Sequence, residues 1–315
     1  MEDVRLPRVS PLVFRRLSVV AAVLLGLIVV SGAAVRLTSS GLGCPDWPRC
    51  TSTSLVAPAT YHALIEFVNR VVTSVVGGFV GIVAVASLLR TPRRRDLVWL
   101  SWGLIAGFVG QAVVGGLSVL YKLSPGWVMA HFLLSMVLVW DGLLLVHRAH
   151  PDWEPRRPEV PRELLVLGRL LVGVAAIVLF LGTVTTGTGP HAGSGGHVKR
   201  LPFALERVTQ LHADSALLLT GLVVAMLFAV RLADAPAVVR QRSTWLAYAV
   251  VAQVAIGYTQ YFLNLPPSVV ELHVAGATLL WSATIWLQLG HTAPAPAHSQ
   301  VALRAVGAEV HHVPL

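Results

Sequence analysis

Three histidines lie inside long apolar stretches of this 315-residue sequence, where ionisable side chains are rare. They are His131, His212 and His273, each a turn or two from one end of its stretch. An ionisable group at such depth in a membrane is costly and usually faces a functional interior. A single histidine of this kind can equally be a packed residue that hydrogen-bonds a neighbouring helix. Three such histidines together make a functional role the better interpretation.

His212 and His273 fall at equal depth in two helices of one predicted four-helix unit. Their imidazoles can therefore approach a flat cofactor from opposite sides. Low-spin haem iron takes two such nitrogens, and bundle interiors are where haem sites are built. Zinc fits less well, because no thiolate or carboxylate accompanies the pair at matching depth. Arg207, further out on the same helix as His212, is interpreted either as a haem-propionate partner or as a snorkelling interfacial arginine.

The first half carries Glu66-Phe-Val-Asn69-Arg70 at the corresponding place. Glu66 and Arg70 are four residues apart and share a helix face. A structural ion pair is the plain interpretation, but two charges beside a candidate haem pocket can also steer a propionate or a proton. His131 is expected to present one imidazole to this candidate pocket of the first half, which is separate from the pocket between His212 and His273.

Cys44 and Cys50 are the only cysteines, and they share one polar loop over residues 38–50. Metal clusters that need four thiolates are therefore excluded. Two prolines shape the loop, and the six-residue separation permits a disulfide. The pair is either a small constraining staple or an exposed dithiol that exchanges electrons; as both residues are expected outside the cytoplasm, we predict that they are oxidised to each other.

These residues need apolar helices to position them, and the composition predicts such helices. The chain is 55% hydrophobic and 12% charged, whereas a soluble domain carries about 25% charged residues. The apolar runs do not alternate with polar residues as barrel strands do, so an all-α integral membrane protein is predicted. Eight helices are expected at residues 15–36, 62–89, 97–119, 127–147, 164–186, 205–231, 243–262 and 268–290.

The charge distribution predicts how the helices cross the membrane. The formal charge of +9 comes from 24 basic residues, most of them arginines in short loops, so topology explains them better than nucleic acid does. They gather in the N-terminus, in the loops after the second, fourth and sixth helices, and in the tail. Both termini are therefore predicted in the cytoplasm of a multi-pass cell-membrane protein, with the histidines towards the opposite side.

The sequence also contains an internal duplication. Gln111-Ala-Val-Val-Gly115 precedes His131 by 20 residues, and Gln253-Val-Ala-Ile-Gly257 precedes His273 by the same 20. A nearly equal offset places His212 opposite Asn69, and Gly182 falls opposite Gly32. Two tandem, parallel, pseudo-symmetric four-helix bundles are therefore predicted. Their expected limits are 1–14 for the N-terminus, 15–148 for the first unit, 149–163 for a linker, 164–290 for the second unit and 291–315 for the tail.

Taken together, these residues resemble the haem A synthase family of membrane enzymes. The resemblance covers all eight helices. It depends on Gly41-Leu-Gly-Cys44-Pro-Asp-Trp-Pro-Arg-Cys50, on Glu66-Phe-Val-Asn69-Arg70, on the loop from Thr186 to Gly193 and on the three histidines. Asn69 is a departure, because the commonest motif has histidine there.

The resemblance implies that haem O is converted to haem A by successive hydroxylations of one methyl group, with oxygen and an external reductant. It implies that His212 and His273 ligate a haem b, and that haem O is received near the catalytic residues Glu66 and His131, with His131 on the substrate iron. Arg70 and Arg207 are expected to bind the cofactors. Expected partners are a membrane electron donor such as a quinol, the haem O synthase and cytochrome oxidase assembly factors. The sequence does not decide whether copper binds.

Two other functions use the same residues. A membrane b-type electron-transfer cytochrome without a substrate typically needs two haem ligands in each half. The first half has Asn69 where its second ligand would stand. A membrane thiol–disulfide oxidoreductase would use Cys44 and Cys50 but ordinarily needs a second reactive pair.

Overall fold

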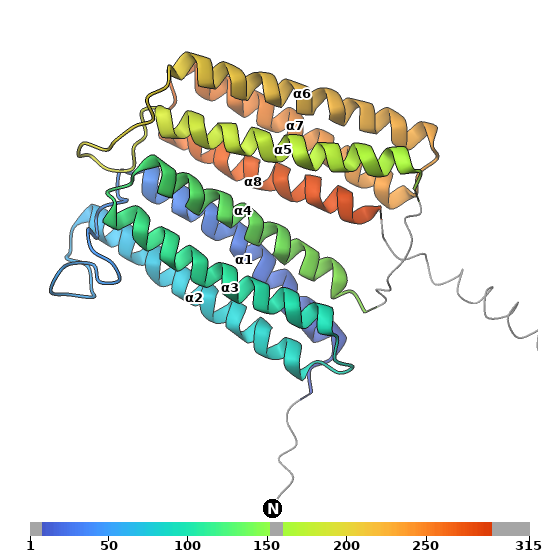
Figure 1. Ribbon diagram of the computed structural model, residues 1–315, viewed down its shortest axis with the longest axis horizontal. Coiled ribbons are helices and arrows are strands. Elements are labelled where there is room, and N and C mark those ends of the chain that lie inside the picture. Colours follow the sequence, from blue (N-terminus) through green and yellow to red (C-terminus); the bar gives the residue numbers. More distant parts are fainter. Residues whose placement is uncertain (1–7, 152–159, 292–315) are drawn as a thin grey trace, which may run out of the picture.

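The computed structural model of the protein describes residues 8–151 and 160–291. Residues 1–7, 152–159 and 292–315, which belong to the predicted N-terminus, linker and tail, lie outside the described residues. The described part is all-helical in its regular structure (Figure 1). Its eight helices are α1 (Pro11–Leu37), α2 (Tyr61–Leu89), α3 (Arg95–Leu120), α4 (Pro125–Arg148), α5 (Arg162–Thr188), α6 (Leu205–Leu232), α7 (Ala237–Phe262) and α8 (Pro267–Gly290).

Each predicted helix is found, but some ends differ. Helix α1 begins at Pro11 rather than at 15, because the Ser10 side chain caps it by accepting a hydrogen bond from the Val13 amide. Helix α7 begins at Ala237 rather than at 243, so Arg240 and Arg242 lie in its first turns and not in a loop. The expected ends followed the limits of the apolar runs, whereas a helix continues past the apolar stretch wherever its backbone is hydrogen-bonded.

Seven of the described helices are long and apolar enough to cross a membrane, and α7 is not among them. Arginines in its first turns and the glutamines Gln253 and Gln260 lower its hydropathy. The apolar helices also present large hydrophobic side chains outward, such as Trp99 on α3 and Leu279 on α8. A surface of this kind suits contact with lipid. The protein is therefore a multi-pass membrane protein.

The contacts between helices divide them into two groups, which can be followed in Figure 1. In the first group α1 and α3 each contact both α2 and α4, and in the second group α5 and α7 each contact both α6 and α8. Helices α2 and α4 are not in contact with each other within the described residues, and neither are α6 and α8. Each of these two pairs therefore stands diagonally across its group.

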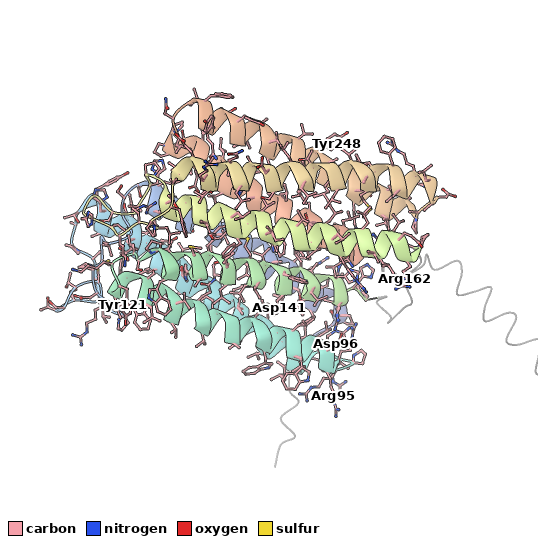
Figure 2. All side chains as sticks on the ribbon, turned by 45° about the horizontal axis from the view of Figure 1, so that its top comes forward. Arg95, Asp96, Tyr121, Asp141, Arg162 and Tyr248 are labelled. Atoms are coloured by element: carbon pink, nitrogen blue, oxygen red, sulfur yellow. A yellow bond between two sulfur atoms is a disulfide. The ribbon has the colours of Figure 1, made fainter. Side chains whose placement is uncertain are left out.

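The two groups pack together through α1 and α4 on one side and α5 and α8 on the other. A buried hydrogen bond crosses this interface at 2.9 Å, from the Trp281 indole nitrogen Nε1 of α8 to the Met136 carbonyl of α4. Arg95, Asp96 and Arg162 lie at one end of the helices and Tyr121 lies at the opposite end (Figure 2). We call the Tyr121 end, where the loop over residues 38–50 also lies, the loop end.

Candidate functional site

His212 on α6 and His273 on α8 face each other across the second group. Their ring centroids are 6.3 Å apart, and the ring planes are inclined by 74°. The Nδ1 atom of His212 lies 3.1 Å from the Val178 carbonyl oxygen, which accepts a hydrogen bond from a protonated Nδ1. That hydrogen bond leaves the lone pair on Nε2, the nitrogen that can bind a metal.

The separation of the two rings fits a pair of axial ligands. An iron–nitrogen bond of about 2 Å on each side, plus roughly 1 Å from each nitrogen to its ring centre, gives roughly 6 Å between centroids. The observed 6.3 Å agrees with this distance. The approach of His212 and His273 that the sequence predicted is therefore found, and the separation of the two rings is compatible with an iron atom between them.

A glycine of the preceding helix lies beside each of the three membrane histidines. A Cβ atom on Gly182 would be 3.2 Å from the His212 ring, and one on Gly257 would be 3.3 Å from the His273 ring. In the first group, a Cβ on Gly115 would be 2.9 Å from the His131 ring. The glycines thus let each imidazole pack directly on the neighbouring helix.

Two glutamines support the histidine-bearing helices. Gln253 Nε2 donates to the His273 carbonyl oxygen at 2.8 Å and lies 3.2 Å from His273 Nδ1. Gln111 Nε2 donates to the His131 carbonyl oxygen at 3.1 Å and to Ser135 Oγ at 2.6 Å. Their sequence motifs revealed the duplication, but the supporting role of the side chains was not predicted.

The fourth position of this pattern holds Asn69 on α2, diagonally across the first group from α4. Its Oδ1 accepts a hydrogen bond of 2.8 Å from Ser31 Oγ on α1. A Cβ on Gly32 would have no atom within 4 Å, whereas a Cβ on Gly182 would contact the His212 ring. At the two positions that correspond to His212 and His273, the first group therefore has one histidine, His131, and a Cβ on Gly32 would enter open space.

Glu66 and Arg70 hold the loop over residues 38–50, which we call the Cys loop. Glu66 is buried, with its Oε2 accepting the Cys44 amide at 2.8 Å and its Oε1 lying 2.5 Å from the Arg70 guanidinium. Arg70 also donates to the carbonyl oxygens of Cys44, Asp46 and Arg49. The i,i+4 ion pair is found, and both carboxylate oxygens are engaged in anchoring the loop.

The two cysteines of this loop form the predicted disulfide. Cys44 is 0% exposed and Cys50 is 1% exposed, so an external thiol does not reach the sulfur atoms while the loop is closed. Burial of this kind favours the constraining staple over the exposed dithiol.

The Cys loop also packs onto α3 next to His131. A Cβ on Gly116 would lie 2.6 Å from the Trp47 ring, and the adjacent Gly115 is the residue that contacts the His131 ring. Trp47 and His131 therefore meet the same turn of α3. This contact could not be predicted from the sequence, because the Cys loop and α3 are far apart along the chain.

Arg36 joins the two groups at the loop end. Its guanidinium, at the end of α1, donates to the His191 carbonyl oxygen at 2.8 Å and to the Thr186 carbonyl oxygen at 2.9 Å. Arg200 donates to the same Thr186 oxygen at 2.6 Å, and burial lowers the pKa of this guanidinium. The segment after α5 thus contacts both groups, through the His191 carbonyl oxygen and through Arg200.

Arg207 is exposed on α6. Within residues 8–151 and 160–291, no three or more His, Cys, Asp or Glu side chains come together as a site for a metal ion. The candidate ligands in these residues are the His212–His273 pair, whose ring centroids are 6.3 Å apart, and the single imidazole of His131.

Comparison with known families identifies the same segments. The sequence matches the model of COX15-CtaA, described as cytochrome oxidase assembly protein, over residues 15–62 and 56–194, which is more than half of the chain. The chain belongs to the COX15-CtaA family. The matched residues include the Cys loop, Asn69 and His131, and they end before His212 and His273.

Several curated relatives of the COX15-CtaA chain are named heme A synthase. The protein from Lysinibacillus sphaericus is 32% identical over 129 residues, covering 41% of this chain and 42% of the relative. Those from Shouchella clausii and Listeria monocytogenes are 25% and 27% identical, covering 58% and 53% of the relatives. The chain thus spans about half the length of the curated relatives it matches.

Proposed function

We propose that this COX15-CtaA protein is a haem A synthase, which oxidises one methyl group of haem O to a formyl group for cytochrome oxidase assembly. The family, the names of the relatives and the residues of both helix groups support this assignment. Chemically, the reaction is an oxidoreduction by successive hydroxylations that consume oxygen, protons and electrons.

One observation carries the proposal: the second group brings two imidazoles together, whereas the first group presents the single imidazole of His131 beside the Cys loop. The second group has two imidazoles whose ring centroids are 6.3 Å apart, which suits a six-coordinate haem b with no vacant iron position. The first group has His131 but holds Asn69 where the second has His212. A haem with one protein ligand keeps one face of its iron open, and this suits a substrate that must react with oxygen.

In this scheme His212 and His273 hold haem b, which when bound supplies one-electron transfer. His131 holds the substrate haem O. Gln111 supports the His131 helix, and the glycine beside each ring sets how closely that ring approaches the preceding helix.

Glu66 is proposed as a site residue that acts indirectly, through the Cys loop. Its carboxylate and the Arg70 guanidinium fix the loop, and the loop places Trp47 on the turn of α3 that also contacts His131. Haem-propionate binding by Arg70 competes with three loop carbonyls, so exposed Arg207 is the better partner for a propionate.

We further propose that α7 is an eighth span and that the two groups are parallel repeats. Both termini then lie in the cytoplasm, and the loop end with the haem sites lies outside. A quinol or similar membrane donor supplies the electrons. The haem O synthase, which makes the substrate, and oxidase assembly factors, which accept the product, are the proposed protein partners.

The electron-transfer cytochrome and the thiol–disulfide oxidoreductase are less well supported. Asn69 offers a neutral amide where a second haem ligand is needed, and the only cysteine pair is buried as a disulfide.

The test is a haem analysis in a host that lacks its own enzyme. Cells that express the chain should accumulate haem A, His131→Ala should abolish the conversion, and Asn69→Ala should retain most of it. All variants must accumulate to equal amounts and keep the haem b spectrum. If the wild-type chain carries haem b but converts no haem O, the proposed synthase function is refuted. If His131→Ala keeps the activity and Asn69→Ala loses it, the substrate ligand lies on α2 and not on α4.

A further inference from the structure

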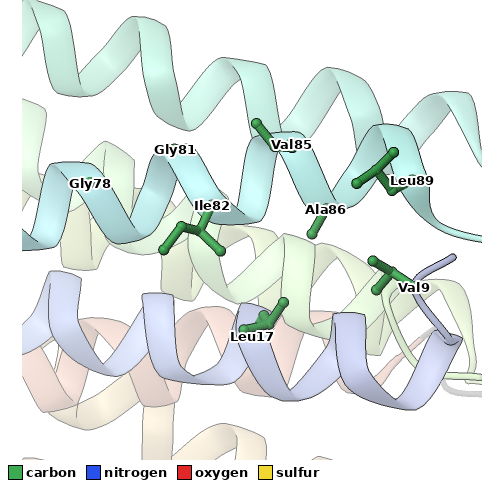
Figure 3. Close-up of a pocket in the computed structure, with 8 residues that line it drawn as sticks. All are labelled: Val9, Leu17, Gly78, Gly81, Ile82, Val85, Ala86 and Leu89. Carbon is green, nitrogen blue, oxygen red and sulfur yellow. The ribbon is translucent and has the colours of Figure 1, made fainter. Parts of the chain in front are cut away.

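An apolar groove runs between α1 and α2 (Figure 3). It includes Leu89, the last residue of α2, and so lies at the end of this helix opposite the Cys loop. Its volume is about 500 Å³. The α2 wall is formed by Gly78, Gly81, Ile82, Val85 and Leu89, and Leu17 faces it from α1. A Cβ atom on either glycine would have no atom within 4 Å, so the glycines leave the groove open.

The length of the groove matches one leaflet of a bilayer. From Gly78 to Leu89 the helix advances about 16 Å at 1.5 Å per residue. This is roughly half of the 30 Å hydrocarbon thickness, so the groove begins near the middle of the membrane and opens at one surface. A single extended acyl chain has the same reach.

Two exposed arginines lie close in sequence to the residues at the mouth of the groove, and backbone pairing fixes the position of one of them. The Val9 amide donates to the Leu89 carbonyl oxygen at 3.0 Å, and the Thr91 amide donates to the Val9 carbonyl oxygen at 3.0 Å. Val9 also lines the groove, so this short pairing fixes the exposed Arg8 directly at the mouth. Arg93, also exposed, follows Leu89 by four residues.

We propose that this groove binds one phospholipid with an anionic headgroup. One acyl chain lies along α2 from Leu89 to Gly78, and the headgroup lies against Arg8 and Arg93. Basic clusters at the membrane surface favour anionic over zwitterionic lipids by about 1 kcal/mol for each arginine, which is about fivefold. The site is separate from the histidines and does not rest on the proposed function.

Native mass spectrometry of the purified full chain tests the proposal. The probe is an equimolar mixture of phosphatidylglycerol and phosphatidylcholine. The wild type should retain one lipid and prefer phosphatidylglycerol by about 25-fold. Gly81→Leu fills the groove, and it should lower lipid retention at least tenfold. Gly221→Leu is its matched control on α6, where a Cβ also has no atom within 4 Å, and retention should be unchanged.

A second pair of variants tests the charge. Arg8→Gln with Arg93→Gln should bring the preference close to parity while one lipid is still retained. Arg162→Gln with Arg231→Gln removes two exposed arginines of α5 and α6 and should leave the preference unchanged. Gly78→Leu repeats the groove test if Gly81→Leu lowers the helical circular dichroism signal.

Equal retention by the wild type and a folded groove-filling variant would overturn the proposal. Equal retention of the two lipids by the wild type would overturn its anionic class. A dimer that disappears in Gly81→Leu would assign the groove to a second copy of the chain instead.

Discussion

Replacing Asn69 by histidine tests whether one residue separates the two helix groups. In the second group, a Cβ placed on the neighbouring glycine would lie 3.2 Å from the His212 ring or 3.3 Å from the His273 ring, whereas a Cβ placed on Gly32 would have no atom within 4 Å. The larger imidazole of Asn69→His therefore has space beside α1. It would also stand on the helix diagonal to α4, as His212 stands diagonal to His273.

The expected cost to the fold is small. Asn69→His removes the 2.8 Å hydrogen bond from Ser31 Oγ, and a hydrogen bond of this kind contributes about 1 kcal/mol. Ser31 keeps an acceptor, because its hydroxyl also lies 3.2 Å from the Ile28 carbonyl oxygen. We therefore expect the free energy of unfolding to fall by about 1 kcal/mol or less, and the variant to accumulate normally.

The assay counts low-spin haem per purified chain by optical and electron paramagnetic resonance spectroscopy, with haem supplied in excess. The wild type should carry about one six-coordinate haem, and Asn69→His about two, because both groups then offer two imidazoles. Asn69→Gln keeps the amide and is the matched control, for which the count should not rise. A folded Asn69→His with an unchanged low-spin count would refute the reasoning.

Three further predictions follow from the site. His212→Ala and His273→Ala should each abolish the low-spin b-type spectrum, and an unchanged reduced spectrum in both would remove these residues as ligands. Without reductant, Cys44 and Cys50 should give no alkylated thiols, and two after reduction and unfolding; labelling of both in the unreduced protein would contradict the disulfide. Arg36→Ala should lower the free energy of unfolding by roughly 2–3 kcal/mol, because two charged hydrogen bonds between the groups are lost, with Arg36→Lys intermediate in thermal unfolding. An unchanged unfolding temperature would show that the contact does not hold the groups together.

Much of the helical fold could be predicted from the sequence, because a membrane helix needs a long apolar run and little else. The runs are visible without knowledge of what they contact. The equal depth of His212 and His273 likewise predicts that they approach, and their rings are 6.3 Å apart, although their role as iron ligands stays a prediction. The ends of α1 and α7 were misplaced because capping and continued backbone hydrogen bonding are local effects that hydropathy does not measure.

The interactions around the first histidine could not be predicted in the same way. The spacing of Glu66 and Arg70 correctly indicated an ion pair, but their remaining partners lie in a loop more than fifteen residues earlier. The same holds for Trp47, whose contact with Gly116 depends on how the loop folds over α3. The contacts of Arg36 could not be predicted either, because its acceptors are the carbonyl oxygens of His191 and Thr186 and a backbone carbonyl has no sequence signature.

The packing of α8 against both α1 and α4 has a consequence for biosynthesis. The first four helices complete their ring of contacts before α8, the last helix of the described residues, is synthesised. Until then the faces of α1 and α4 that α8 will cover meet lipid, which is as apolar as the side chains that replace it. The Met136 carbonyl that receives Trp281 belongs to a helix and needs no other partner while it waits. Each half can therefore be inserted in a finished state, and two separately translated halves should assemble in the bilayer.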